Sequence, residues 1–344
     1  MIHDQKYPPL NPQFHELFWR DVPSGEISAY VKPYTVEDVV ARRADLDAHL
    51  ISDEELTQGG AVSFEERTVP GYEGGPEVPI LILRPRDAVG ARPGLLLTNC
   101  AGKMTSHPRM IKGLGFVEWV AKHQIVLVVN GMRTAPEDPH PAQVHDSYAA
   151  LCWVAAQHES LGLDPDRLGL LGVSGGGGVA AATALYARDH GGPSLSNLIV
   201  LSPMLDDRDI TVSNWFERVP HPHDANHMAW TAMLGDAKGG PLVDAYAAPS
   251  RATTLRGLPP MYIETGSADI FRDESLEFAM RAGQAGVPVE VHSWAGLVHS
   301  GETIAPGLDL SRMVLAARDG YLQRFGSPAG GLVPNVHPDE LKQS

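Results

Sequence analysis

A serine set between glycines at the end of an apolar run is the feature of this sequence best suited to covalent chemistry. Residues 168–179 read LGLLGVSGGGGV, and the stretch from Gly172 to Gly176 fits the pattern G-x-S-x-G. The run before Ser174 is typical of a buried strand and residues 179–189 of a helix, which is the context a nucleophile elbow requires. The N–H of the next residue, at a helix N-terminus, can then meet developing negative charge. We predict that Ser174 is a nucleophile; the alternative is a serine that only caps the helix.

A serine hydroxyl needs a general base, and that base needs an orienting carboxylate. Asp269 comes just after MYIETG and His299 just after VEVHSW, so each follows an expected strand. The chain order serine, acid, histidine is that of the α/β hydrolases. Asp273 and His292 are the nearby alternatives, but Asp273 is expected to cap the next helix and His292 to lie within the strand. We therefore predict a triad of Ser174, His299 and Asp269.

The elements that must hold these residues alternate from residue 62 onward. Runs typical of strands occur at 62–71, 78–85, 94–99, 125–130, 167–173, 197–202, 261–266 and 287–294. Helical patterns lie at 116–123, 145–160, 179–189, 276–286 and 311–325. Short continuous apolar strands separated by helices indicate a mostly parallel, eight-stranded sheet with helices on both faces.

Two segments depart from this alternation. Residues 1–60 are more polar, with a helix expected to begin at Thr35, and we assign them to a helical cap. Residues 203–258 form an excursion assigned to the same cap. The α/β core then comprises 61–202 and 259–325, and 326–344, rich in Gly and Pro, is expected to be an irregular tail.

The chain resembles the hormone-sensitive-lipase-like α/β hydrolases, a group of bacterial carboxylesterases, from about Val62 to Phe325. The resemblance lies in RTAPEDPHPAQVHDSYAALCW, LGLDPDRLGLLGVSGGG, LSPMLDDRD, LPPMYIETGSADIFRDE and AGVPVEVHSWAGLVHS, in that order. It implies an α/β-hydrolase fold, the same three catalytic residues, a cap over the site and a possible homodimer formed through a sheet edge.

One motif of that family is missing. Where members carry His-Gly-Gly-Gly, whose backbone N–H groups line the oxyanion hole, residues 99–104 read NCAGKM. By register Ala101 and Gly102 would donate, together with Gly175, which replaces the usual alanine. Lys103 is expected near the entrance, either solvent-exposed or attracting a substrate carboxylate. Cys100 is expected to be a packed thiol.

Composition excludes several other classes of function. A net charge of −15 argues against nucleic-acid partners, and the longest apolar runs are strand-sized, which argues against membrane insertion. Two cysteines exclude a disulfide framework. The N-terminus has no secretory pattern, so a cytoplasmic protein is expected. His221, His223 and His227 have metal-like spacing, but position 225 is alanine, so we predict no metal and no cofactor.

The sequence therefore predicts a serine hydrolase that cleaves small to medium carboxylic esters through an acyl-enzyme. Met104, Leu205 and Trp215 are the candidate pocket walls. A lactone, carbamate or amide hydrolase with the same triad is the alternative, and a non-catalytic small-molecule receptor is a more distant one.

Overall fold

The computed structural model describes residues 6–24, 26–31 and 35–326, and the tail expected beyond Gly326 lies outside them. The strands are β1 (Val62–Val69), β2 (Val78–Pro85), β3 (Arg92–Thr98), β4 (Val126–Asn130), β5 (Leu163–Val173), β6 (Asn197–Leu201), β7 (Met261–Ala268) and β8 (Val289–Val298). The α-helices are α1 (Pro12–Trp19), α2 (Val36–Ala44), α3 (Asp53–Thr57), α4 (Phe116–His123), α5 (Ala142–Ala156), α6 (His158–Leu161), α7 (Ser174–Asp189), α8 (His223–Leu234), α9 (Arg272–Gln284), α10 (Gly301–Ile304) and α11 (Asp309–Gly326).

The eight strands form one sheet in the order β1-β2-β4-β3-β5-β6-β7-β8. β1 and β2 run antiparallel to their neighbours, and all later pairs are parallel. This confirms the predicted α/β-hydrolase sheet. β5 lies near the centre, so Ser174, directly after it, stands at the carboxyl edge of the parallel strands.

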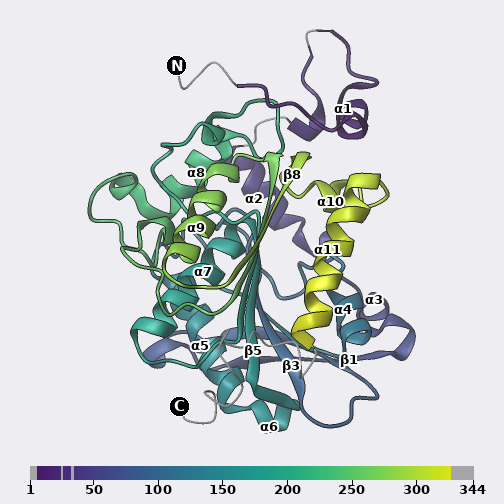
Figure 1. Ribbon diagram of the computed structural model, residues 1–344, viewed down its shortest axis with the longest axis vertical. Helices are drawn as coiled ribbons and strands as arrows, with labels where there is room; N and C mark the ends of the chain where they lie inside the picture. The colour runs from purple at the N-terminus through teal and green to yellow at the C-terminus, as the bar shows by residue number, and fades with distance from the viewer. Residues whose placement is uncertain (1–5, 25, 32–34, 327–344) are drawn as a thin grey trace, which may run out of the picture.

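Helices cover both faces of the sheet, as Figure 1 shows with α5, α7 and α9 on one side and α4 and α11 on the other. Each face has its own apolar core. The first joins alternate strand residues, such as Leu170, to α5, α7 and α9, and the second joins the other set, such as Leu171, to α4 and α11. Because side chains alternate along a strand and both sets are buried, the central strands read as continuous apolar runs.

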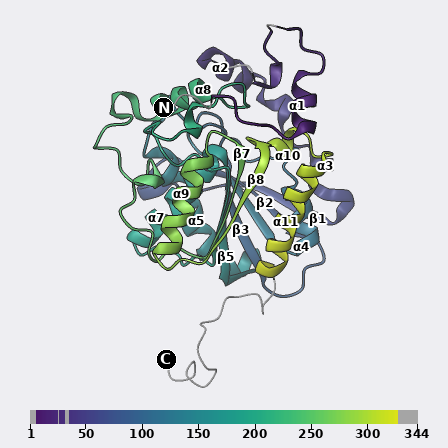
Figure 2. The same cartoon turned by 45° about the horizontal axis from the view of Figure 1, so that its top comes forward.

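The helices α1, α2 and α8 gather beyond the end of the sheet where the β7 and β8 arrows finish (Figure 2). Thr35 caps α2 through a capping box with Asp38, at the expected helix start. Val39 of α2 shares one apolar cluster with Trp230 of α8 and Phe216, so the N-terminal segment and the 203–258 excursion pack together. We name this apolar cluster the cap cluster. Its buried members are Val39, Met104, Ala135, Met204, Phe216, Val219, Ala229, Trp230, Met233, Val243, Ala247, Ala248, Ile270 and Phe271.

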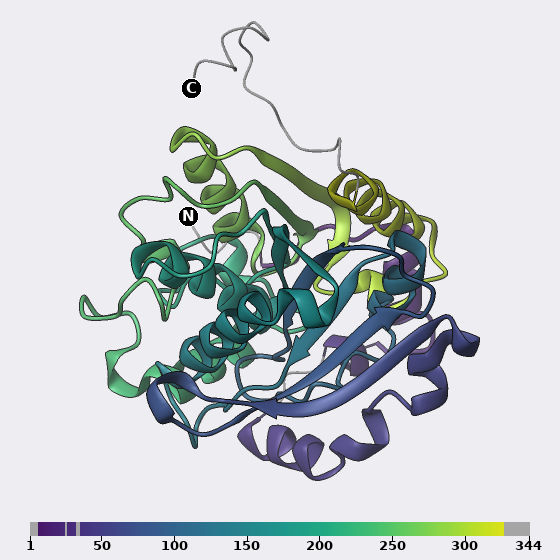
Figure 3. The same ribbon diagram turned by 90° about the horizontal axis from the view of Figure 1, so that it is seen from below.

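Both predicted cap segments also contribute to the core. Leu56 of α3 is fully buried in the apolar core that lies between the sheet and α4 and α11. Figure 3 shows the same sheet from below, with β1 at its edge. Ala252, Leu255 and Leu258 lie in the core cluster formed by α5, α7 and α9. The early part of 1–60 and residues near α8 therefore cover the carboxyl end of the sheet, whereas 51–60 and 249–258 pack against its body.

Candidate active site

Ser174 stands on a sharp turn where β5 ends and α7 begins. Its φ of 56° lies in the left-handed region, which a non-glycine residue adopts at a cost. The turn requires glycine on both sides: a Cβ on Gly172 would lie 2.4 Å from the Gly176 carbonyl oxygen, and one on Gly176 would lie 2.1 Å from the Thr98 carbonyl oxygen. Gly172 lies in β5, whereas the four glycines after Ser174 belong to α7 itself, which begins at Ser174 rather than near 179.

The three residues predicted from separate parts of the chain form one hydrogen-bonded series. His299 Nε2 lies 3.0 Å from Ser174 Oγ, and His299 Nδ1 lies 3.0 Å from Asp269 Oδ2. Asp269 is fully buried, and its other oxygen accepts the Phe271 N–H at 3.0 Å. An ionised carboxylate can only accept, so Nδ1 carries the hydrogen and Nε2 faces the serine hydroxyl as an acceptor. This arrangement can remove a proton from Ser174.

Burial and the neighbouring charges shift the pKa values of His299 and Asp269 in opposite directions. Burial lowers the pKa of His299, but the Asp269 carboxylate outweighs it and leaves that pKa above the ordinary 6.5. Burial raises the pKa of Asp269, but His299 and the Phe271 N–H outweigh it and leave that pKa lowered. The carboxylate is therefore kept charged and stabilises an imidazolium beside it.

The loop that replaces the glycine-rich motif differs from the expected oxyanion arrangement. The Ala101 N–H donates to the Thr105 carbonyl oxygen at 2.8 Å, closing a tight turn. The expectation that Ala101 donates to an oxyanion is therefore wrong. Gly102 and Lys103 follow with φ values of 52° and 58°, and their amide nitrogens lie against Gly175. Within the described part of the chain, the Gly102 amide makes no hydrogen bond to another protein group.

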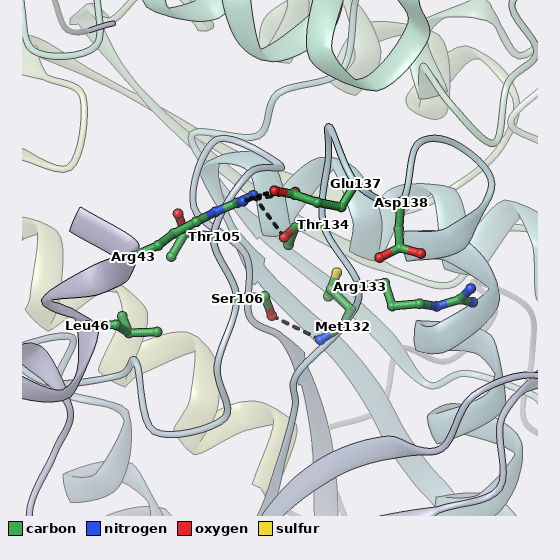
Figure 4. Close-up of a pocket in the computed structure, with 9 residues that line it drawn as sticks. All are labelled: Arg43, Leu46, Thr105, Ser106, Met132, Arg133, Thr134, Glu137 and Asp138. Atoms are coloured by element: carbon green, nitrogen blue, oxygen red, sulfur yellow. Dashed lines mark hydrogen bonds and ion pairs between the residues drawn. The ribbon is translucent and has the colours of Figure 1, made fainter. Parts of the chain in front are cut away.

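An arginine of α2 forms a hydrogen bond with the backbone at the end of the loop 99–104. Arg43 of α2 donates through Nε to the Met104 carbonyl oxygen and through Nη2 to the Ala135 carbonyl oxygen, both at 2.5 Å. Its Nη1 lies 2.9 Å from both Glu137 oxygens, and Figure 4 shows the guanidinium reaching Glu137 and Thr134. These contacts border a cavity of about 320 Å³ lined by Arg43, Leu46, Thr105, Ser106, Met132, Arg133, Thr134, Glu137 and Asp138. The sequence analysis missed Arg43, because a single arginine in an amphipathic helix carries no signal of a contact some 60 residues away.

Lys103 is the side chain whose position differs most from expectation. It is 1% exposed, so the predictions of solvent exposure or of a place at the entrance are both wrong. Its Nζ lies 4.9 Å from the centre of the Trp230 ring. The neighbouring Cys100 is buried, as expected, and burial raises the pKa of its thiol to about 11. A neutral, enclosed thiol is a packing group rather than a nucleophile.

The three predicted pocket walls occupy different surroundings. Met104 is buried in the cap cluster. Leu205 is fully buried in the core with α7, so its assignment as a pocket wall is wrong. Trp215 lines a cavity of about 670 Å³ between the N-terminal segment and residues 215–224. That cavity also includes Pro222, and the ring of the adjacent His221 lies 5.4 Å from the ring of His299.

The competing aspartate has a different role from the one expected. Asp273 lies inside the first turn of α9, whose N-cap is Phe271, so the capping prediction is wrong. Its carboxylate accepts the Ser213 N–H at 2.9 Å and thereby ties the excursion to α9.

Two histidines of the stretch 221–227 lie near a carboxylate that the sequence analysis did not consider, that of Asp209. Asp209, His223 and His227 place one ligand atom each within 4.8 Å of one another. However, Lys238 Nζ lies 2.5 Å from the Asp209 oxygen that faces the histidines. An ammonium already neutralises the oxygen that would face a cation, so these residues form an ion-pair network and fit a metal ion poorly.

The sheet and a serine elbow with an aligned histidine and aspartate define an α/β hydrolase arrangement. A profile of the α/β hydrolase fold matches residues 100–302, and the chain belongs to this family. It is 32% identical over 247 residues to the carboxylesterase NlhH of Mycobacterium tuberculosis, covering 69% of this chain and 74% of that protein. It is 36% identical over 179 residues to the esterase LipI of the same species, covering 51% of this chain and 55% of that one.

Solved structures agree with this assignment. A bacterial heroin esterase has a TM-score of 0.83 at 33% identity, covering 93% of this chain and 99% of its own. The esterase LipW of Mycobacterium marinum has a TM-score of 0.78 at 26% identity, with coverages of 94% and 99%. Among the described residues, every helix is too short or too polar to cross a bilayer.

Proposed function

We propose that this chain is a carboxylesterase-type serine hydrolase in which Ser174, His299 and Asp269 act as nucleophile, general base and orienting acid. The carrying observation is the unbroken series of hydrogen bonds from Ser174 through His299 to the buried Asp269. The named carboxylesterase and esterase relatives support an ester as the substrate class.

The reaction follows from these contacts. His299 Nε2 removes the Ser174 proton as Oγ attacks the ester carbonyl, and Asp269 stabilises the resulting imidazolium. The tetrahedral oxyanion is met by the amides of Gly102 and Gly175, with the Lys103 amide beside them. The imidazolium then protonates the leaving alcohol, and water repeats these steps on the acyl-enzyme.

The cap cluster supports small to medium apolar esters as substrates. Phe271 belongs to it, and its ring lies 5.2 Å from the His299 ring at an interplanar angle of 74°. Apolar side chains next to the base favour acyl or alcohol groups that also lose contact with water. The cavity lined by Trp215 and Phe216, near the same histidine, is our candidate for the route by which esters enter.

The decisive experiment is hydrolysis of p-nitrophenyl acetate and butyrate by the Ser174→Ala variant. We expect at least a ~10⁴-fold loss of kcat, with unchanged circular dichroism, because the nucleophile is removed and the fold is kept. Ser160→Ala, on the exposed surface of α6, is the matched control and should retain full activity. Substantial turnover by Ser174→Ala would overturn the assignment, as would failure of the wild-type protein to react with a fluorophosphonate probe.

The unusual loop 99–104 supports a second candidate function, which is hydrolysis of lactones, carbamates or amides by the same triad. This loop borders the reacting carbonyl, and its turn at Ala101–Thr105 replaces the glycine-rich motif. Rates for linear esters, cyclic lactones and anilides measured side by side would rank these substrates.

We further propose a homodimer formed through the free edge of β8, the last strand of the sheet. Residues 289–295 of β8 are all half-buried or exposed, and Val291 is 46% exposed. Light scattering coupled to gel filtration would test this proposal, and Val291→Lys should then shift the protein toward monomer.

A further inference from the structure

Lys103 lies against two glycines of α7, one beside its backbone nitrogen and the other beside its Nζ. A Cβ on Gly175 would lie 2.7 Å from the Lys103 amide nitrogen, and a Cβ on Gly178 would lie 3.1 Å from Lys103 Nζ. Gly175 and Gly178 are three residues apart and therefore on one face of α7. The lysine thus begins beside the candidate oxyanion donors and extends along the first turn of the helix. The consecutive glycines after Ser174 make room for it.

The amine at the end of this side chain has no anionic partner within salt-bridge distance among the described residues. Its close neighbour is the Trp230 ring, whose face attracts a cation. It also lies at the N-terminal end of α7, where the helix dipole is positive and opposes a further positive charge. Burying an ammonium here costs free energy that the Trp230 ring offsets only in part, whereas an exposed lysine is the ordinary outcome.

The titratable groups around this amine compensate its charge only in part. Cys100, in the same loop, has a pKa raised to about 11 by burial and stays neutral. Glu274, from α9, lies near enough that its negative charge raises the pKa of Lys103, but burial raises the pKa of Glu274 itself and so disfavours that charge. Arg43, from α2, is itself a cation and bonds Glu137.

The remaining carboxylates on neighbouring elements are engaged elsewhere. Asp206, after β6, is bound by Arg208. Asp269, after β7, is bound by His299. The helix turn against which the lysine lies contributes only glycine.

We propose that the Lys103 ammonium supplies positive potential to the oxyanion site from behind its backbone donors, without touching the substrate. This rests on the proposed ester hydrolysis. The charge lies about one helical turn, some 5 Å along α7, from the amides at Gly175. The oxyanion therefore forms about 8 Å from it, where a unit charge acting through an effective dielectric constant of about 20 changes the rate by up to about 30-fold. Lys103 is therefore a positioning residue and not a catalytic one, because its charge acts on the oxyanion only through the electrostatic potential at the backbone amides.

The experiment compares Lys103→Met and Lys103→Gln with the wild type on p-nitrophenyl butyrate. We expect kcat to fall about 10- to 30-fold in both, with KM changed less than about twofold, because only the charged intermediate feels the ammonium. Binding of a trifluoromethyl ketone, which forms a tetrahedral oxyanion with the serine, should weaken by the same factor. Lys122→Met, an exposed lysine paired with Asp319, is the matched control and should leave both values unchanged.

Stability separates this role from a structural one. Burial lowers the pKa of Lys103 from 10.5 to about 8, so below about pH 8 the folded state bears the full cost of an enclosed charge. That cost is relieved as the pH rises from about 8 toward 10.5. Lys103→Met should therefore be as stable as the wild type or more so at pH 7, with the difference shrinking above pH 8. The wild-type kcat should also decline above about pH 8, and this decline should be absent from Lys103→Met.

Three results would overturn the proposal. They are a kcat within twofold of wild type, a parallel loss of kcat and thermal stability in Lys103→Met, and retention of full activity by the neutral Lys103→Gln. Each leaves the proposed esterase function intact, because that function is decided by Ser174→Ala and not by any Lys103 variant.

Discussion

The Cα of Gly175 and the backbone nitrogen of Lys103 are in such close contact that a methyl group on Gly175 would lie 2.7 Å from that nitrogen. The Gly102 nitrogen would lie 3.0 Å from the same methyl. Sequence comparison with the lipase-like family gave two separate departures here, a missing glycine-rich motif and a glycine in place of alanine after the nucleophile. The two departures are linked, because the loop 99–104 lies so close to α7 that a side chain at position 175 would meet its backbone.

The first prediction concerns that contact. Gly175→Ala should lower kcat about 10²-fold, because the methyl pushes the Gly102 and Lys103 amides away from the oxyanion, and loss of one donor has an effect of this order. The measurement is kcat for p-nitrophenyl butyrate together with the midpoint of thermal unfolding.

Gly283→Ala in α9 provides the control for a glycine-to-alanine change in a helix. A Cβ there meets no atom within 4 Å, so this variant should keep its activity and gain about 0.5–1 kcal/mol in the free energy of unfolding. If Gly175→Ala were as active as the wild type, the loop could move freely, and its amides would not be preorganised donors.

The proposed serine, histidine and aspartate of the triad could be predicted from the sequence because their signals are local. Ser174 follows a buried strand, and Asp269 and His299 each follow another, so the topology of a parallel sheet brings all three to one edge. The strands themselves were recognisable because both faces are covered, which makes their apolar runs continuous.

The oxyanion loop could not be derived in the same way. Whether Ala101 donates to an oxyanion or to Thr105 depends on the left-handed conformations of Gly102 and Lys103, and a non-glycine residue seldom adopts one. Lysine is normally exposed, so the burial of Lys103 beside Gly175 and Gly178 contradicts the expectation for its residue type. Leu205 was misplaced because an apolar residue after a strand looks alike whether it faces a pocket or the core.

The second prediction concerns the pH dependence of the base. Asp269 raises the pKa of His299 above 6.5 against the effect of burial, and only the neutral imidazole accepts the serine proton. The acid limb of kcat/KM should therefore have its midpoint above pH 6.5. Asp269→Asn removes the main charge that opposes burial and leaves only the more weakly acting Glu302, so the midpoint should move to lower pH. The maximal rate should fall about 10⁴-fold, the loss typical of this substitution. A midpoint that stays in place would show that a different group controls the limb.

The third prediction concerns Arg43, which joins the cap to the oxyanion loop. Arg43→Gln removes donors from the Met104 and Ala135 carbonyl oxygens, so the loop should become less ordered and kcat should fall roughly 10-fold, an effect of about 1.4 kcal/mol. Arg43→Lys should recover only part of the rate, because an ammonium cannot reproduce the planar arrangement of these bonds.

Glu137→Gln tests whether the ion pair or the carbonyl contacts matter. The Glu137 side chain is 63% exposed, and exposed pairs contribute little, so this variant should stay within twofold of the wild-type kcat. Equal losses in Glu137→Gln and Arg43→Gln would assign the effect to the ion pair and contradict our interpretation of the carbonyl contacts.

The last prediction concerns the buried arginine behind the histidine loop. Arg318 is 4% exposed and bonds Glu264 and Glu302 at 2.6 Å each, and Glu302 lies three residues after His299. Arg318→Met leaves two carboxylates buried without a counter-ion, so the free energy of unfolding should fall by about 3–5 kcal/mol at pH 8.

Adding Glu264→Gln and Glu302→Gln to Arg318→Met removes both unpaired charges. Urea unfolding of this triple variant should recover much of the lost stability, since a neutral buried cluster avoids the cost of desolvated charge. If the single and triple variants were equally unstable, packing of the arginine stem, and not its charge, would hold α11 against the histidine loop.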